Sequence, residues 1–171
     1  LSKKAGAPVM LRVTREDEYY IGRARPALHS RVKIGFKKDG RITAIDGLAI
    51  VDNGPYDVVN DGRSAGDHIS LSYQPPAMRW RTLNVLTNTP SRGAQRAPGG
   101  MQGNSLMEPI LAKAARALGV DQVALRRINA PSGKAPFGAP NARGTRQYAT
   151  SAFLKEALDK GATEFNWEAR K

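Results

Sequence analysis

The feature that most constrains the fold is an Asp39-Gly40 pair set between two apolar segments. Residues 30–37, which precede it, alternate apolar with polar or small side chains, as is typical of a half-buried strand. Residues 42–51, which follow it, form a second strand-like run rich in isoleucine and alanine. Because Asp-Gly is a strong signal for a tight hairpin turn, the sequence predicts an antiparallel hairpin here. The side chains expected on its buried face are Val32, Ile34 and Phe36.

Outside this hairpin, the sequence predicts two further strands and an irregular connection. Residues 7–14 and residues 81–87 are the expected strands, and residues 15–20 suit one turn of helix. Residues 52–80 contain several Gly, Pro and Asp-Gly breakers. A loop-rich stretch is therefore expected between the hairpin and the third strand.

Helices are expected after residue 103, where apolar residues recur at helical spacing. Ser105 and Glu108 stand at capping-box spacing, and Gly119 is a typical end. Asp121 can cap a second helix that runs to Asn129. The apolar positions of the first helix are Met107, Ile110, Leu111, Ala114 and Leu118.

The remaining residues, 131–171, are expected to form a loop plus a C-terminal helix. Thr150 or Ser151 can cap this helix, which would end at Lys160 before Gly161. Strands therefore come first and helices later along the chain. This order predicts the α+β class, with antiparallel strands or a hairpin followed by helices.

The charge balance is strongly basic, with 27 Lys and Arg against 15 Asp and Glu and a net charge of +12. Such a balance raises nucleic acid or an acidic protein as a partner. The basic residues are scattered, however, and no stripe of aromatic residues alternates with them. This distribution argues against a nucleic-acid interface, although a basic, non-catalytic binding domain remains the alternative hypothesis.

Several kinds of site are excluded by residue type. The chain contains no cysteine, which removes disulfides, thiolate zinc sites and cysteine-ligated iron–sulfur clusters. The two histidines, His29 and His68, lie 39 positions apart, so no metal site built from side chains is expected. No apolar run is long enough for a membrane span. The start at Leu1 has neither Met nor an apolar leader, so we expect a piece of a longer polypeptide.

The stretch most suited to binding is residues 88–103, which hold four glycines and two prolines between a predicted strand and a predicted helix. Glycines let the main chain approach a ligand closely, and a helix start offers N–H groups to an anion or a polar oxygen. The pattern matches neither a Walker loop nor a dinucleotide fingerprint. Taken by itself, it leaves open an anion site or a plain connecting loop.

Five segments, in order, resemble the large subunit of the molybdenum hydroxylases, the xanthine dehydrogenase and aldehyde oxidase family. The most specific is Thr87-Asn88-Thr89-Pro90 followed by Ala94-Gln95-Arg96-Ala97-Pro98-Gly99-Gly100-Met101-Gln102-Gly103. It is similar to the family's Thr-Asn-x-Pro segment and its Ala-x-Arg-(Gly or Ala)-x-Gly-x-x-Gln-Gly loop. The other four lie within residues 7–18, 32–46, 52–56 and 117–129. The resemblance covers about residues 7–130 and implies that residues 1–171 are part of a larger molybdopterin-binding domain.

The resemblance implies that the loop approaches the molybdenum centre mainly through main-chain amides. Arg96 and Ala97 would lie beside the ligand shell of the metal, although Arg96 could instead pair with a surface carboxylate. Pro98 would lie near the substrate. Xanthine-oxidising members carry Phe there, so aldehydes or other small compounds are favoured over purines. The residues implied to shape the cofactor-facing turn are Gly99, Gly100, Gln102 and Gly103.

The resemblance also implies what this segment lacks. The family's earlier glycine-rich loop and its late catalytic glutamate have no counterpart, so no catalytic residue is expected here. The expected reaction of the whole enzyme is hydroxylation of an aldehyde or heterocycle carbon with oxygen from water. The [2Fe–2S] clusters and FAD would lie on other domains or subunits. The expected partners are those iron–sulfur and flavin subunits, the remainder of the large subunit and a small-molecule substrate. The compartment would be the cytoplasm or the periplasm, with the cytoplasm favoured.

Overall fold

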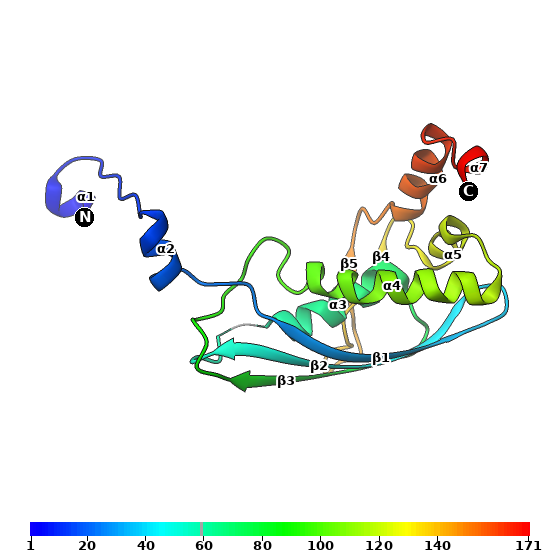
Figure 1. The fold of residues 1–171 in the computed structure, drawn as a ribbon, viewed down its shortest axis with the longest axis horizontal. Coiled ribbons are helices and arrows are strands. Elements are labelled where there is room, and N and C mark those ends of the chain that lie inside the picture. Colours follow the sequence, from blue (N-terminus) through cyan, green and yellow to red (C-terminus); the bar gives the residue numbers. More distant parts are fainter. Residues whose placement is uncertain (59) are drawn as a thin grey trace.

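The computed structural model describes residues 1–58 and 60–171 as an arm, a sheet covered by helices, and a C-terminal lobe (Figure 1). The arm contains α1 (Ser2–Ala5) and α2 (Arg15–Ile21), and neither helix has a buried residue. The helical turn predicted for residues 15–20 is confirmed. The strand predicted for residues 7–14 is wrong, since these exposed residues pair with no strand in the described chain. A short apolar run alone cannot make a strand without a neighbour for its backbone hydrogen bonds.

The sheet has the order β1-β2-β3, with β1 (Leu28–Phe36), β2 (Ile42–Gly54) and β3 (Met78–Leu86). The predicted hairpin is confirmed, because β1 and β2 pair antiparallel and Ile34 lies opposite Ile45. Gly40 closes the turn in a left-handed conformation, with φ of 88°. The strand predicted for residues 81–87 is also confirmed, but it begins earlier and pairs parallel to β2.

The parallel pair requires a crossover, which is supplied by α3 (Asp61–Tyr73). The prediction of a loop-rich stretch over residues 52–80 is therefore wrong in its centre. The Asp61-Gly62 pair contributed to the error, because it begins the helix rather than a turn. Two glycines of α3 serve packing. A Cβ at Gly62 would lie 2.8 Å from Cγ2 of Val51, and a Cβ at Gly66 would lie 2.5 Å from Cδ1 of Trp80. The glycines thus let α3 lie against the sheet.

The helices α4 (Gly100–Leu118) and α5 (Gln122–Asn129) follow β3 and agree largely with the sequence. Gly119 ends α4, and the Asp121 side chain caps α5 by accepting from the Ala124 N–H at 2.8 Å. The capping role expected of Ser105 is wrong, because α4 begins five residues earlier. Glu108 instead accepts a hydrogen bond from the Tyr73 hydroxyl at 2.6 Å.

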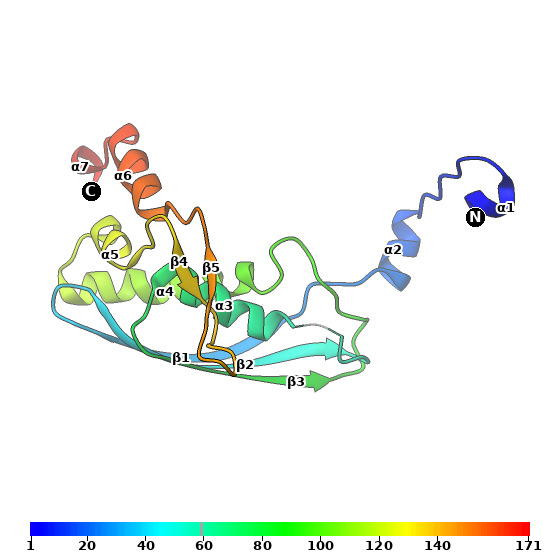
Figure 2. The same ribbon diagram turned by 180° about the vertical axis from the view of Figure 1, so that it is seen from behind.

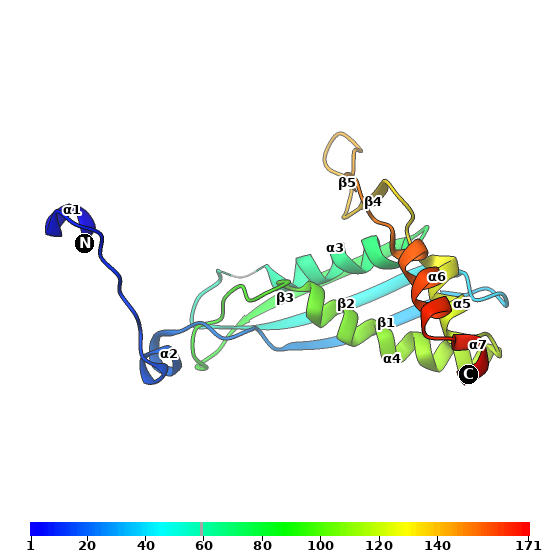
Figure 3. The ribbon, with the colours of Figure 1, turned by 90° about the horizontal axis from the view of Figure 1, so that it is seen from above.

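The core lies between one face of the sheet and the helices α3, α4 and α5 (Figure 3). Its buried members come from β2 and from all three helices, and β1 and β3 add half-buried side chains. The α+β class is thereby confirmed, although a helix separates the second and third strands. The buried cluster consists of Ile42, Ile45, Ile69, Tyr73, Met107, Leu111, Ala115 and Leu125.

The C-terminal lobe contains a small hairpin and two helices (Figure 2). The strands are β4 (Ala135–Phe137) and β5 (Gln147–Ala149), and the helices are α6 (Leu154–Glu164) and α7 (Trp167–Arg170). The expected caps Thr150 and Ser151 are wrong, since Phe153 precedes α6 without a side-chain cap. Gly161 lies inside α6 rather than after it, as an isolated glycine can. In the described chain, no helix combines the length and apolar character that crossing a bilayer requires.

Candidate functional site

The loop between β3 and α4 begins at the carboxyl ends of the parallel strands, where Asp52 organises it. Its carboxylate accepts hydrogen bonds from the hydroxyls of Thr87 at 2.5 Å and Thr89 at 3.0 Å. The Arg92 guanidinium donates to it at 2.5 Å. The Thr87 hydroxyl, and then Arg92 and the Gly54 N–H, hold the pKa of Asp52 well below its usual range. Asp52 is therefore an ionised anchor for the first half of the loop.

The second half of the loop is held by Arg25, which lies just before β1. Its guanidinium donates to the main-chain oxygen of Arg96 at 2.6 Å and to that of Ala97 at 3.5 Å. It also donates to the side-chain oxygen of Gln102 at 3.3 Å. One arginine thus fixes both the tip of the loop and the first turn of α4.

A buried carboxylate supports the same turn from the α3 side. Asp61, which is 2% exposed, accepts hydrogen bonds from the Gly99 N–H at 3.1 Å and the Gln102 side-chain amide at 2.9 Å. An internal acid therefore occupies part of the helix start that the sequence offered to an external anion. A ligand of this site would have to meet the exposed tip of the loop instead.

The three glycines of the predicted site are buried, and they face α3. Gly99 has a φ of 73°, and a Cβ there would lie 2.3 Å from the main-chain oxygen of Asp61. A Cβ at Gly103 would lie 3.1 Å from the main-chain oxygen of Ala65, and one at Gly100 would contact His68. Glycine is required at position 99, where φ is positive and a Cβ would overlap the α3 main chain, while the small size of Gly100 and Gly103 lets α4 start directly against α3. They support the turn from behind.

Arg96, Ala97 and Pro98 form the exposed tip of the loop. Ala97 has a φ of 51°, a left-handed conformation that costs a residue with a Cβ about 1–2 kcal/mol. Two hydrogen bonds to the Ala97 main-chain oxygen hold this conformation. One comes from the Arg25 guanidinium, and the other comes from the Met101 N–H at 3.2 Å. Within residues 1–58 and 60–171, the Arg96 side chain makes no ion pair.

Sequence reasoning located the loop but missed the residues that hold it. Arg25 is one of the scattered basic residues, and Asp61 belongs to the Asp-Gly pair that helped to predict a loop within residues 52–80. Nothing in the local sequence distinguishes either from an ordinary polar residue. Asp61 lies 41 positions before Gln102 and Arg25 lies 77 before it, so only the folded chain brings them together.

The family model for the molybdopterin cofactor-binding domain matches residues 1–130. The xanthine dehydrogenase molybdenum-binding subunit of Escherichia coli O157:H7 is 33% identical over 174 residues, covering 99% of this chain and 22% of its own length. Aldehyde oxidase 4 of Arabidopsis thaliana is 31% identical over 137 residues, covering 75% of this chain and 10% of its own length.

Solved structures have the same fold. Quinoline 2-oxidoreductase from Pseudomonas putida 86 superposes with a TM-score of 0.74 at 22% identity, covering 98% of this chain and 22% of that one. Aldehyde oxidoreductase from Desulfovibrio gigas superposes with a TM-score of 0.68 at 26% identity, covering 83% of this chain and 15% of that one. The chain thus spans about one fifth of the length of the first curated relatives that it matches.

Proposed function

This chain belongs to the molybdopterin cofactor-binding domain family of xanthine dehydrogenases and aldehyde oxidases, and from that premise we propose that its 87–103 loop forms one wall of a molybdenum cofactor site. The whole enzyme would hydroxylate an aldehyde or heterocycle carbon with oxygen from water. The observation that carries the proposal is the tip at Arg96–Pro98, which is exposed and strained yet fixed from behind by Arg25.

The chemistry of the tip fits an anionic, oxygen-rich group. Arg23 and Arg96 are exposed there, and Arg25 lies directly beneath, so the surroundings carry positive charge. Because the Arg96 and Ala97 carbonyls bond inward to Arg25, the exposed tip offers its guanidinium and main-chain N–H groups to such a ligand. In the described chain, no three His, Cys, Asp or Glu side chains come together as a metal site would require. The chain would therefore hold the cofactor by its organic and oxygen groups.

The residues divide into three roles under this proposal. Arg96 and Ala97 bind and orient the cofactor's oxygen side, and Pro98 borders the substrate. Gly99, Gly100, Gln102 and Gly103 hold the turn in place against α3, largely through Asp61. The bound cofactor would supply a two-electron acceptor, while the protein fixes position and charge around it.

Other parts of the enzyme would complete the reaction. No acidic side chain belongs to the tip, so we propose that the base is the family's late glutamate, outside this chain. The iron–sulfur clusters and FAD would likewise lie on other domains or subunits. Large exposed apolar side chains are consistent with a surface that further protein covers. They include Val9, Met10, Leu11, Tyr19, Tyr20, Ile21, Leu83 and Leu86.

The test is the molybdenum content of the purified enzyme that contains this chain, with Arg25→Ala compared with the unaltered protein. We expect stoichiometric molybdenum in the unaltered enzyme and a several-fold loss in Arg25→Ala, because the tip loses two hydrogen bonds and the first turn of α4 loses one. Lys113→Ala, at an exposed position on α4, is the control and should retain molybdenum. An unaltered enzyme without molybdenum would refute the proposal, and full retention in Arg25→Ala would refute the role of the tip.

The alternative is a basic binding face on the outer side of the sheet. Arg79 donates to the Asp46 carboxylate at 2.7 Å and Arg81 at 3.3 Å, while Lys33 lies opposite Asp46 in register. The Arg79 hydrogen bond is the main cause that lowers the pKa of Asp46 to about 2. The face still carries an excess of positive charge, to which Arg31 adds.

This alternative makes a separate prediction. A face that binds nucleic acid would give an affinity for duplex oligonucleotide that falls linearly in log salt. No detectable binding at low salt would remove nucleic acid as a partner.

A further inference from the structure

Within residues 1–58 and 60–171, no further strand pairs with the outer side of β3, so this edge of the sheet is open. The Ala77 oxygen accepts from the Ile45 N–H at 3.0 Å, and the Thr87 N–H donates to the Gly54 oxygen at 2.9 Å. Within residues 77–87, the odd-numbered residues therefore direct their main-chain N–H and C=O groups toward β2. Because alternate residues of a strand point to opposite sides, Met78, Trp80 and Thr82 direct theirs away from the sheet.

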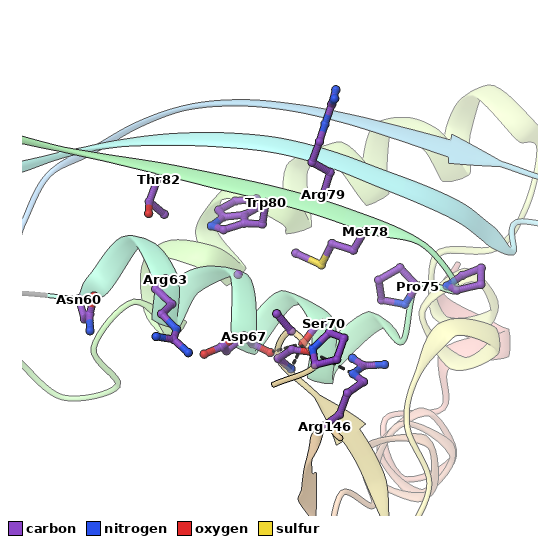
Figure 4. Close-up of a pocket in the computed structure, with 15 residues that line it drawn as sticks. Asn60, Arg63, Asp67, Ser70, Pro75, Met78, Arg79, Trp80, Thr82 and Arg146 are labelled. Atoms are coloured by element: carbon purple, nitrogen blue, oxygen red, sulfur yellow. Dashed lines mark hydrogen bonds between the residues drawn. The ribbon is translucent and has the colours of Figure 1, made fainter. Parts of the chain in front are cut away.

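A cavity of about 770 Å³ lies directly beside this edge (Figure 4). It is bounded by β3, by α3 and by the loop that joins β4 to β5. Its β3 wall includes Met78, Trp80 and Thr82, the residues whose main-chain groups point outward. The side chains of an added strand would thus enter the cavity while its backbone paired with β3.

The charges around the cavity favour an acidic occupant. Arg63 on α3 and Arg146 beside β5 line it, together with one carboxylate, Asp67. Arg79 points away from the cavity (Figure 4) and pairs with Asp46 on the other face of the sheet. The floor is apolar, formed by Met78 and Trp80. A segment with apolar side chains and an acidic one matches these surroundings, as well as the net charge of +12.

Two other occupants fit less well. A small molecule would fill the cavity but would leave the row of outward main-chain groups without partners. A second copy that paired β3 with β3 would bring Arg79 and Arg81 of both copies together, and like charges across strands are unfavourable. Since the chain spans 22% of the length of its first relatives, most of such a subunit lies outside it.

We propose that the edge of β3 receives an extended, acidic segment from the remaining part of the molybdenum-binding subunit. The segment adds a fourth strand to the sheet and fills the cavity between β3 and α3. This inference rests on the proposed function, because it takes the partner from the same enzyme. It assigns the cavity to assembly of the subunit rather than to substrate.

The test is residue-resolved hydrogen exchange on the assembled enzyme that contains this chain. The amides of Arg79 and Arg81 face β2 and serve as internal controls, which should be protected in either case. We expect the amides of Met78, Trp80 and Thr82 to be protected as well, exchanging at least about 100-fold more slowly than unstructured amides. Slow exchange at Arg79 and Arg81 together with fast exchange at Met78, Trp80 and Thr82 would overturn the proposal.

The occupant is then identified with a photo-crosslinking residue at position 82 in the same enzyme. Cross-links to one extended segment of the molybdenum-binding subunit, outside residues 1–171, support the proposal. Cross-links to a second copy of this chain, to another subunit only, or to no polypeptide overturn it. Molybdenum measured on the same sample separates the two proposals. An enzyme with molybdenum but an open β3 edge refutes only the added strand, and a protected edge without molybdenum refutes only the cofactor site.

Discussion

Asp61 connects the starts of two helices that lie far apart in the sequence. Its buried carboxylate accepts from Gly99 and Gln102, so removing it leaves two polar donors without their partner. We expect Asp61→Ala to lower the free energy of unfolding by about 3 kcal/mol, since each buried unsatisfied donor costs about 1–3 kcal/mol. Urea denaturation measures this loss. Asp61→Asn, which keeps an acceptor oxygen, should lose less, and an equal loss in both variants would contradict this account.

Asp52 should make stability depend on pH in the acid range. Its folded-state pKa lies below the ordinary value of 3.8, with the Thr87 hydroxyl as the largest cause. Below that value the unfolded chain takes up a proton that the folded chain does not, so stability falls as pH drops toward the folded pKa. We expect the unfolding free energy of Asp52→Asn to fall less steeply between pH 5 and pH 2.5. Parallel curves for the two proteins would show that Asp52 contributes nothing to this dependence.

At the scale of single residues, the sequence predicts where the loop lies but not which residues hold it. The motif around Arg96 is contiguous, so its position between a strand and a helix can be inferred directly. Arg25 and Asp61 act through hydrogen bonds across 71 and 38 positions, which no local pattern encodes.

Among the elements, α3 depends most on small residues. Trp80 lies between Gly47 on β2 and Gly66 on α3, and a Cβ at either glycine would lie within 2.5 Å of the indole. We expect Gly66→Ala to destabilise the fold by about 1–3 kcal/mol through overpacking. At Gly161 on α6, an added Cβ would have no atom within 4 Å apart from its chain neighbours and the helix's own backbone. Gly161→Ala should therefore stabilise the fold by about 0.5–1 kcal/mol. Thermal unfolding compares them, and the same sign in both would contradict the packing role of Gly66.

The β1–β2 hairpin and α3 show why some elements are predictable and others are not. The first strand of the hairpin alternates and a turn dipeptide follows it, so the local sequence specifies an antiparallel pair. The register shift between Gly35 and Phe36 is not encoded in that pattern. In α3, glycine and serine replace the usual apolar residues because the helix packs closely on the sheet. Its helical pattern is therefore weak, and its glycines resemble turn signals.

For the whole molecule, Asn129 connects the helical layer to the sheet. Its side chain accepts from the Ile42 N–H at 2.9 Å and donates to the oxygens of Gly40 at 2.9 Å and Leu125 at 2.8 Å. We expect Asn129→Ala to cost about 2–3 kcal/mol, because it leaves buried backbone groups without partners. Asn104→Ala, at an exposed position on α4, is the matched control and should change stability by less than about 0.5 kcal/mol. Equal melting temperatures for the two variants would contradict this role.

The parallel β2–β3 pair also bears on how the chain folds. Ile45 meets Met78 only after α3 has closed the intervening chain, whereas the β1–β2 hairpin forms from neighbouring residues. Contacts between distant residues form slowly, so β3 is expected to join the sheet late. Until it does, β2 is itself an edge, and afterwards the edge of β3 takes its place. Until the rest of the enzyme joins it, the chain therefore presents a strand with an open edge, which favours aggregation unless that part is made alongside it.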